Sequence, residues 1–356
     1  MTAPEEIFVG GGEMEAIMRS LDWSQTSLGS PEIWPQSLQT SISICLSSQF
    51  PILLWWGTDL VMFYNDAYRP ILGAKHPSMG QRGRDCWAEV WDAIGPMLQG
   101  VLLSGEATCS ENQLLLLKRH GYLEECYFTF SYSPIADETG GIGGVFTTVT
   151  ETTRQVIGER RLKTLRDLAA NTGRAKTVEE VYSAAIATLA GNPNCIPFAL
   201  LYRIESDERA HLVGATGLEA GTAASPQVVD LSQAQAWPFE QVRTTAQAQR
   251  IENLRTRFGE LFDKTGTTIA NDALLLPLTQ AGDQQRVMGF LVLGISSKLA
   301  FDSDYQSFFD LVAGSVETAI TNVEAYEAKH QRAEAPTECD RANAALRQSE
   351  EQLRLA

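Results

Sequence analysis

The sequence has no long hydrophobic run. A bilayer-spanning helix needs roughly 18 or more consecutive apolar residues, and the nearest candidate, Ile52–Trp56, has only the length of a strand. Residues 1–15 carry acids and glycines in place of the basic start and apolar segment of a secretory signal. Basic residues are also few, 28 against 44 acidic ones, and a net charge of −16 repels phosphates and anionic lipids. We therefore expect a cytoplasmic protein with no nucleic-acid partner and no membrane partner.

Cysteine and histidine are scarce and scattered. The six cysteines form no CxxC pair, and without an export signal they are expected to be free, mostly buried thiols. The four histidines do not stand at the short paired intervals that zinc sites use. The sequence therefore predicts no metal site.

Nucleotide-binding and catalytic motifs are absent as well. The sequence contains no GxxxxGK[ST] loop, and no GxGxxG follows a predicted strand. The glycine cluster at 140–144 is a turn between strands, so it lacks the helix N-terminus that a phosphate site needs. We expect no catalytic residue in this chain, and its segment of the protein is predicted to be non-catalytic.

The first half of the chain has the pattern of an antiparallel sheet with helices. A length of 356 residues favours about two domains. Ser30 and Pro31 predict a helix start, with Pro51 as its end. Five strand-like runs follow, interrupted by a segment of short helices: Ile52–Trp56, 60–64, 113–117, 127–132 and 142–149. Helices over one face of a five-stranded sheet would bury the apolar stripes.

Aromatic residues alternate along the fourth of these runs. Phe128, Phe130 and Tyr132 fall on one face, which is the pattern of a half-buried strand. Together with residues from the neighbouring elements they define a candidate cofactor or ligand cavity, predicted to be lined by Trp91, Met97, Phe128, Phe130, Tyr132 and Phe146. The alternative that these side chains are plain core stays open, because the sheet must bury that face in any case.

The second half predicts a linker helix and a second α/β domain. Residues 155–170 are helical by periodicity, and Thr177 to Glu180 form a capping box that opens another helix. Strands are predicted at 198–204, 211–216, 273–278 and 287–295, and residues 219–266 give weaker signals. A last helix is expected to begin after Asp302 and Ser303.

That last helix contains a heptad pattern. Apolar residues alternate at spacings of four and three, which predicts a dimer seam: Val312, Val316, Ala319, Val323 and Tyr326. Pro336 interrupts the pattern, and a second seam runs out of phase from Cys339 to Ala356. We therefore expect a parallel homodimer and an exit helix that leads into a further domain of a longer protein.

Short motifs carry a resemblance to a known family. The motifs are Asp22-Trp23-Ser24, Ser27-Leu28-Gly29, Trp34-Pro35-Gln36-Ser37-Leu38, Tyr64-Asn65-Asp66-Ala67-Tyr68, Ile71-Leu72-Gly73-Ala74-Lys75-His76-Pro77, Tyr127-Phe128-Thr129-Phe130-Ser131-Tyr132-Ser133-Pro134, Gly143-Gly144-Val145-Phe146, Glu151-Thr152-Thr153 and Glu159-Arg160-Arg161-Leu162. They resemble the N-terminal PAS region of bacterial multi-sensor, hybrid-type histidine kinases. Residues 171–326 look like a GAF domain by strand and helix order, and 346–355 are similar to a helix that leads into another PAS domain.

The resemblance implies an α+β architecture of tandem PAS-like and GAF-like domains, with antiparallel sheets and flanking helices, joined by long signalling helices. The implied boundaries are an N-terminal extension at 1–30, a PAS domain with its cap helix at 31–152, a linker helix at 153–172, a GAF domain at 173–320 and a coiled-coil exit helix at 321–356. The implied function is the input module of a two-component sensor histidine kinase, which relays a ligand or light state to a downstream kinase core.

The same resemblance implies partners and cofactors outside this segment. The downstream kinase core and a response regulator receiver are the expected partners, together with a possible small-molecule ligand and a second copy of the chain. ATP and Mg²⁺ are expected only in the kinase core. His330 lies in Lys329-His330-Gln331-Arg332, without the neighbouring acid of a phospho-acceptor site. The parent chain thus resembles a protein histidine kinase, while this segment is expected to be non-catalytic.

Other readings stay open on the sequence. Cys86 stands where a flavin-binding relative carries its cysteine, but the Arg-Phe-Leu-Gln continuation is missing. Cys195 precedes the first GAF-like strand, which is the wrong place for bilin attachment. A bilin- or flavin-binding photoreceptor, a dimerisation scaffold without ligand, and a cyclase or phosphatase as output are the alternatives. The stimulus itself is not predicted.

Overall fold

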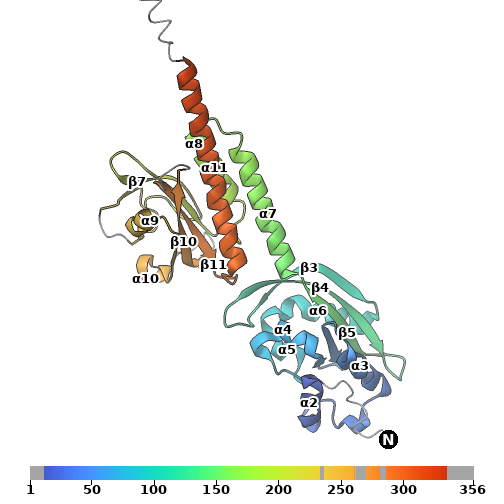
Figure 1. The fold of residues 1–356 in the computed structure, drawn as a ribbon. Helices are drawn as coiled ribbons and strands as arrows, with labels where there is room; N and C mark the ends of the chain where they lie inside the picture. The colour runs from blue at the N-terminus through green and yellow to red at the C-terminus, as the bar shows by residue number, and fades with distance from the viewer. Residues whose placement is uncertain (1–11, 233–235, 260, 262–269, 281–285, 335–356) are drawn as a thin grey trace, which may run out of the picture. The chain divides into compact units, whose positions relative to one another are not determined.

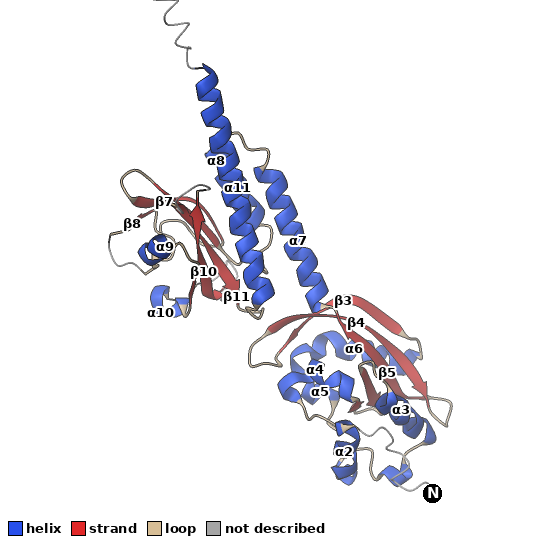
Figure 2. Cartoon of the chain, viewed as in Figure 1, coloured by secondary structure: helices blue, strands red, loops and turns tan. Residues whose placement is uncertain are grey.

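A computed structural model describes residues 12–232, 236–259, 261, 270–280 and 286–334 of the chain. The chain divides into two compact units, Met1–Glu159 and Arg160–Ala356. Each unit holds its own antiparallel sheet with flanking helices (Figures 1 and 2), so the predicted α+β class is confirmed. Among the described residues, no helix combines the length and apolar character that crossing a bilayer requires.

The N-terminal unit is built on a five-stranded sheet with the order β2-β1-β5-β4-β3. The strands are β1 Ile52–Trp56, β2 Val61–Tyr64, β3 Thr108–Leu117, β4 Glu124–Ala136 and β5 Ile142–Glu151. All neighbouring strands pair antiparallel, as the sequence predicts. In β4 the side chains of Phe128, Phe130 and Tyr132 are buried, while Thr129 and Ser131 between them are half-buried.

Short helices connect β2 to β3 and cover one face of the sheet (Figure 2). They are η3 Asp66–Tyr68, α4 Arg69–Leu72, η4 Gly73–Lys75, α5 Gly83–Cys86, η5 Ala88–Val90 and α6 Trp91–Ser104. Helix α6 packs on β4 and β5 and ends at Gly105, which takes a left-handed conformation with φ +71°. Glycine is the usual residue at such a helix end because it has no Cβ to clash.

The N-terminal segment forms α2 Glu13–Ser20, η1 Trp23–Gln25, η2 Pro31–Ile33 and α3 Gln36–Ser47. The prediction that this helix starts at Ser30 and Pro31 is wrong, because α3 begins at Gln36. Pro31–Ile33 is a single 3-10 turn, and Trp34 is extended, with φ −67° and ψ 138°. The reason is Pro35, because a residue that precedes proline disfavours the helical conformation.

The C-terminal unit is built on a six-stranded sheet with the order β8-β7-β6-β11-β10-β9. The strands are β6 Ala199–Ile204, β7 Arg209–Thr216, β8 Val228–Asp230, β9 Gln249–Ile251, β10 Ala270–Thr279 and β11 Val287–Ser296. The four predicted strands are confirmed as β6, β7, β10 and β11. The weaker stretch 219–266 holds elements that the pattern did not predict, namely β8, β9, α9 Phe239–Thr245 and α10 Leu254–Phe258.

Three further helices complete the described chain: α7 Thr153–Thr172, α8 Val178–Leu189 and α11 Ser303–Glu334. The boundary between the two units falls within α7. Two predicted caps are confirmed. The Thr177 hydroxyl accepts a hydrogen bond from the Glu180 amide at 3.2 Å, and the Asp302 carboxylate accepts one from the Tyr305 amide at 2.8 Å.

The predicted dimer seam on α11 needs correction. Val312, Val316, Ala319 and Val323 are at most 8% exposed, because α11 packs on β10 and α8 of its own unit. Of the five seam residues only Tyr326, at 56%, is exposed. The heptad spacing is therefore explained by packing within one chain, and these four side chains do not form a free seam. The second seam, from Cys339 to Ala356, lies outside the described residues.

Candidate ligand-binding cavity

The N-terminal unit contains a pocket with a cavity volume of about 40 Å³ between the sheet and its covering helices. Strands β1, β3, β4 and β5 supply one wall, and the segment from η3 to α6 supplies the other. The lining residues are Leu53, Trp55, Tyr68, Ile71, Trp87, Val90, Ile94, Leu115, Leu117, Phe128, Phe130, Tyr132, Thr147 and Val149.

Half of the predicted cavity residues line this space. Phe128, Phe130 and Tyr132 do, whereas Trp91, Met97 and Phe146 are not among the lining residues. The prediction that Phe146 lines the cavity is wrong, because successive residues of a strand point to opposite faces of the sheet. Its neighbour Thr147 faces the cavity, so Phe146 lies on the other face, where it lines a separate surface hollow with Phe50 and Ile52.

Trp91 and Met97 pack nearby without reaching the cavity. The Trp91 ring lies edge-on to the Trp55 ring, with centroids 6.4 Å apart. Met97 is half-buried against the apolar core, whereas Ile94, one turn earlier on α6, is buried and lines the cavity. The sequence pattern identifies α6 as a cavity wall but not which of its faces points inward.

The cavity wall contains polar groups that could form hydrogen bonds with a bound molecule. Trp87 is 3% exposed, and its buried indole Nε1 has no hydrogen-bond partner within the described part of the chain. The hydroxyls of Tyr68 and Tyr132, on side chains 5% and 4% exposed, bond to no described residue. By contrast, the Trp55 indole donates to the Thr147 hydroxyl at 2.9 Å. A buried donor without a partner costs free energy, so a bound molecule that accepts from Trp87 would relieve that cost.

The lining favours an uncharged molecule. No Lys, Arg, His, Asp or Glu is among the lining residues. Burial raises the pKa of both Tyr68 and Tyr132, so both phenols stay protonated at neutral pH. An ionised ligand would lose its hydration here without gaining a counter-charge. The cavity therefore suits a neutral molecule that is largely apolar and carries a hydrogen-bond acceptor.

The cavity volume limits what fits without movement of the walls. A buried water needs about 10–15 Å³ of accessible volume, and a benzene ring fits a cavity of about 150 Å³. The 40 Å³ present here holds a few waters or a very small molecule. A ring-sized ligand must therefore displace side chains of the wall, and such a displacement would change the packing of the sheet.

An ion cluster around a buried arginine lies where β5 ends. The Arg119 side chain is 8% exposed, and its guanidinium binds both oxygens of Glu151, at 2.7 and 2.8 Å. Its Nε donates to Glu124 at 2.5 Å. The Arg119 carbonyl accepts from the Ala74 amide at 2.9 Å, beside Gly73, where an added Cβ would lie 2.8 Å from that oxygen. Arg119 thus connects the helical cover of the cavity to the last residue of β5.

The charges of this cluster support one another. Burial alone would raise the pKa of Glu124, but hydrogen bonds and the positive charge of Arg119 outweigh it and hold that pKa below its usual range. Burial likewise disfavours the Arg119 cation, yet its bonds to Glu151 and Glu124 raise its pKa. Arg119 and Glu124 therefore stabilise each other's charged form in the folded protein.

The same cluster fixes the beginning of α7. The Thr153 hydroxyl donates to Glu151 at 2.9 Å and accepts from the Tyr127 amide at 2.9 Å. The Thr152 amide donates to the Tyr127 carbonyl at 2.8 Å. Tyr127 directly precedes Phe128, whose side chain lines the cavity. The first residue of α7 is therefore hydrogen-bonded directly to both wall strands, to β4 through Tyr127 and to β5 through Glu151.

The candidate attachment cysteines are both buried. Cys86 is 6% exposed, and burial raises the pKa of its thiol, which is therefore protonated at neutral pH. Cys195 is fully buried and is not a lining residue of the cavity.

Trp237 and Phe239, in the C-terminal unit, are core side chains, and the Trp237 indole donates to the Ala224 carbonyl at 2.8 Å.

Comparisons with known proteins find neither a matching family model nor a matching curated protein. Solved structures do match. The GAF domain of an Acinetobacter phosphoenolpyruvate-protein phosphotransferase is 19% identical, with a TM-score of 0.35 over 47% of this chain and 95% of its own. The GAF domain of the Coxiella burnetii phosphotransferase is 15% identical, with a TM-score of 0.36 over 47% and 96%.

A third match is a methyl-accepting chemotaxis protein, residues 122 to 287, at 14% identity and a TM-score of 0.35, covering 45% of this chain and 99% of that fragment. Similarities at these identities and TM-scores do not indicate a ligand or an activity for this chain. The solved structures similar to part of this chain include GAF domains, a fragment of a chemotaxis protein and free methionine-R-sulfoxide reductases.

Proposed function

We propose that this chain is the sensory input region of a signalling protein, with a PAS-like ligand-binding unit followed by a GAF-like unit. The observation that carries the proposal is the unpartnered, buried indole N–H of Trp87 in an uncharged cavity. The wall strands of that cavity end at the residues that anchor α7. A neutral small molecule with a hydrogen-bond acceptor is the proposed stimulus.

The relay follows from the contacts. A ligand larger than the cavity pushes on β4 and β5, which carry Phe128 and Thr147 in the wall. The same strands supply Tyr127 and Glu151, which hold Thr153. Because Glu151 is bonded to Arg119 as well as to Thr153, a shift of β5 changes both of these contacts together. Ligand binding thereby selects between two positions of the α7 start, which is a small two-state element.

The output belongs to the same proposal. The motif resemblance favours a two-component histidine kinase core downstream, with ATP and Mg²⁺ in that core and a response regulator receiver as its partner. A parallel homodimer is part of this proposal, with a contact surface other than Val312, Val316, Ala319 and Val323, which are buried within the chain.

Neutral ligands are expected to stabilise the full chain. We expect members of a library of small, uncharged aromatic and heteroaromatic compounds to raise the melting temperature by about 5–10 °C at 100 times their Kd. Trp87→Phe removes the unpartnered donor while keeping an aromatic side chain. It should weaken binding of a hit that carries an acceptor by about tenfold, the value of one hydrogen bond.

The matched control is Trp91→Phe, the same exchange four residues along the chain at a side chain that does not line the cavity. Binding by this variant should equal that of the wild type, as measured by calorimetry. If Trp91→Phe weakens binding and Trp87→Phe does not, the assigned cavity is wrong. Visible absorbance of the purified chain would instead favour a photoreceptor, and the absence of both pigment and hits would favour a scaffold.

A further inference from the structure

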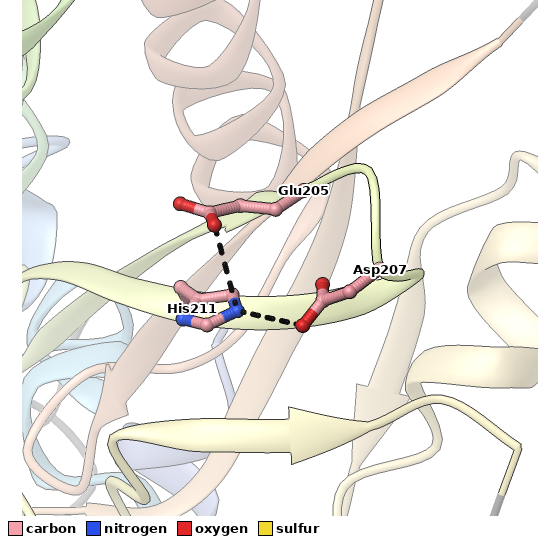
Figure 3. A group of neighbouring side chains, drawn as sticks. All are labelled: Glu205, Asp207 and His211. Atoms are coloured by element: carbon pink, nitrogen blue, oxygen red, sulfur yellow. Dashed lines mark ion pairs between the residues drawn. The ribbon is translucent and has the colours of Figure 1, made fainter.

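The β6–β7 hairpin of the C-terminal unit brings together three potential metal ligands that the candidate cavity does not involve. Among the described residues, one group of His, Cys, Asp or Glu side chains places a ligand atom of each member within 4.8 Å of the others: Glu205, Asp207 and His211 (Figure 3). We propose that this hairpin binds one divalent first-row transition metal ion, such as Zn²⁺, through Glu205 Oε2, Asp207 Oδ2 and His211 Nε2.

The hairpin fixes the backbone of all three residues. Register pairs Arg203 with His211 and Ile204 with Ala210, and the Glu205 amide donates to the Arg209 carbonyl at 3.0 Å. Glu208 turns the chain in a left-handed conformation, with φ +59°. Glu205 therefore lies at the end of one arm and Asp207 in the turn. His211 lies on the other arm and faces them (Figure 3).

Each carboxylate is oriented by a bond to its other oxygen. Glu205 Oε1 accepts from the Arg203 guanidinium at 3.0 Å, and Asp207 Oδ1 accepts from the Arg209 amide at 3.1 Å. The remaining oxygens, Oε2 and Oδ2, lie 3.8 and 3.6 Å from His211 Nε2. This arrangement resembles the outer bonds that orient ligands around protein-bound metals.

His211 Nε2 is the observation that points to an ion. The side chain is 30% exposed, but this atom is shielded from solvent and has no hydrogen-bond partner among the described residues, although two carboxylate oxygens face it. Separations of 3.6 and 3.8 Å are too long for hydrogen bonds. Ligand atoms on a tetrahedral Zn²⁺ lie about 3.3–3.4 Å apart, given bonds of about 2.0–2.1 Å. The two separations from His211 Nε2 need a contraction of only a few tenths of an ångström to reach that value, and all three ligand atoms already lie within 4.8 Å of one another.

The donor set selects the class of metal. Imidazole and carboxylate ligands suit Zn²⁺, Mn²⁺, Co²⁺ and Ni²⁺, whereas Mg²⁺ and Ca²⁺ prefer oxygen ligands alone. Three protein ligands leave at least one position for water or a further ligand. Arg203 also binds Glu179 of α8 at 3.1 Å, so an occupied site would connect the hairpin to that helix through Glu205. Two cations lie beside the cluster, Arg203 at 3.0 Å from Glu205 Oε1 and Arg209 Nε at 4.0 Å from Asp207 Oδ2.

Calorimetric titration of the full, metal-free chain with ZnCl₂ tests the proposal. We expect one site in the wild type and at least about 100-fold weaker binding in His211→Ala, because a direct ligand is worth no less than its outer partners. Glu205→Gln should weaken binding as well. His330→Ala, which removes an exposed histidine of α11, and Cys109→Ser, which removes an exposed thiol, are the controls and should bind like the wild type.

Circular dichroism shows whether His211→Ala is folded, and the melting temperature of the wild type should rise with Zn²⁺ whereas that of the variant should not. Failure of the folded wild type to bind Zn²⁺, Mn²⁺ or Co²⁺ would overturn the proposal and leave His211 as an ion-pair partner of two carboxylates. Equal affinities of wild type and His211→Ala would overturn it too. The site is independent of the cavity, so neither result bears on the proposed ligand function.

Discussion

Replacing Arg119 by alanine is expected to lower the free energy of unfolding of the N-terminal unit by about 3 kcal/mol. The loss is large because Glu151 and Glu124, 28% and 14% exposed, would lose the charged hydrogen bonds from Arg119 and keep only the Thr153 and Tyr122 hydroxyls and the His120 ring as partners. Six of the seven tryptophans lie in this unit, so urea unfolding followed by tryptophan fluorescence reports mainly on it. Arg82→Ala is the matched control, because that side chain is 57% exposed and its pair with Asp59 is worth little.

The effect of Arg119→Ala should depend on pH in a defined direction. The pKa of Glu124 is lower in the folded protein than in the unfolded chain, because its bonds to Arg119 outweigh its burial. The stabilisation by this carboxylate is therefore fully present above its unfolded pKa, about 4.3, and is lost as the pH falls through the lower folded value. The difference between wild type and Arg119→Ala should narrow below about pH 4. A difference that stays constant would mean that Glu124 does not contribute.

Phe128→Ala is expected to cost about 3–5 kcal/mol and to enlarge the cavity. The side chain is 2% exposed and lines the cavity, so its removal loses apolar burial and leaves an unfilled space. The enlarged cavity should then admit a benzene ring. We expect benzene to raise the melting temperature of Phe128→Ala more than that of the wild type, as measured by calorimetry.

Phe146→Ala is the control for this prediction, because the same side chain is removed from the opposite face of the sheet. Phe146 is half-buried and does not line the cavity, so its removal should cost about 1 kcal/mol and create no benzene site. Equal losses of stability, or benzene binding by Phe146→Ala, would show that the faces of β4 and β5 are assigned incorrectly.

Strands and caps were predictable because their signals are local. Alternation of Phe128, Phe130 and Tyr132 specifies which face of β4 is buried, and no distant residue changes that pattern. Thr177 and Asp302 cap their helices through bonds that span only three residues. The five-stranded sheet followed from such signals, since sequential antiparallel strands often pair.

Other features depend on tertiary packing, which periodicity does not specify. A heptad pattern marks one apolar face of α11, but the same face serves equally well against a second copy or against the chain's own sheet. The structure shows the second case, with Val312 and Val316 fully buried in their own unit. Likewise, the short strands β8 and β9, with three residues each, are too short to show a period.

The candidate sites show the same division. The sequence pointed to β4 and to α6 as walls of the cavity, but the contributions of Tyr68 and Trp87 came only from the structure. Tyr68 does lie in one of the motifs behind the family resemblance, and that motif was the available signal. The metal prediction relied on paired His and Cys spacing, whereas Glu205, Asp207 and His211 meet across a hairpin turn, so their contact required the strand register.

Hydrogen exchange at the start of α7 tests most directly whether the cavity and the helix are coupled. The measurement compares the amide of Thr152 and those of residues 153–159 with and without the strongest neutral binder. We expect binding to change their exchange in the wild type, and to leave it unchanged in Thr153→Val, which still binds but lacks the hydroxyl that joins Tyr127 and Glu151. A ligand that fills the cavity while exchange at the α7 start stays the same in the wild type would contradict the account.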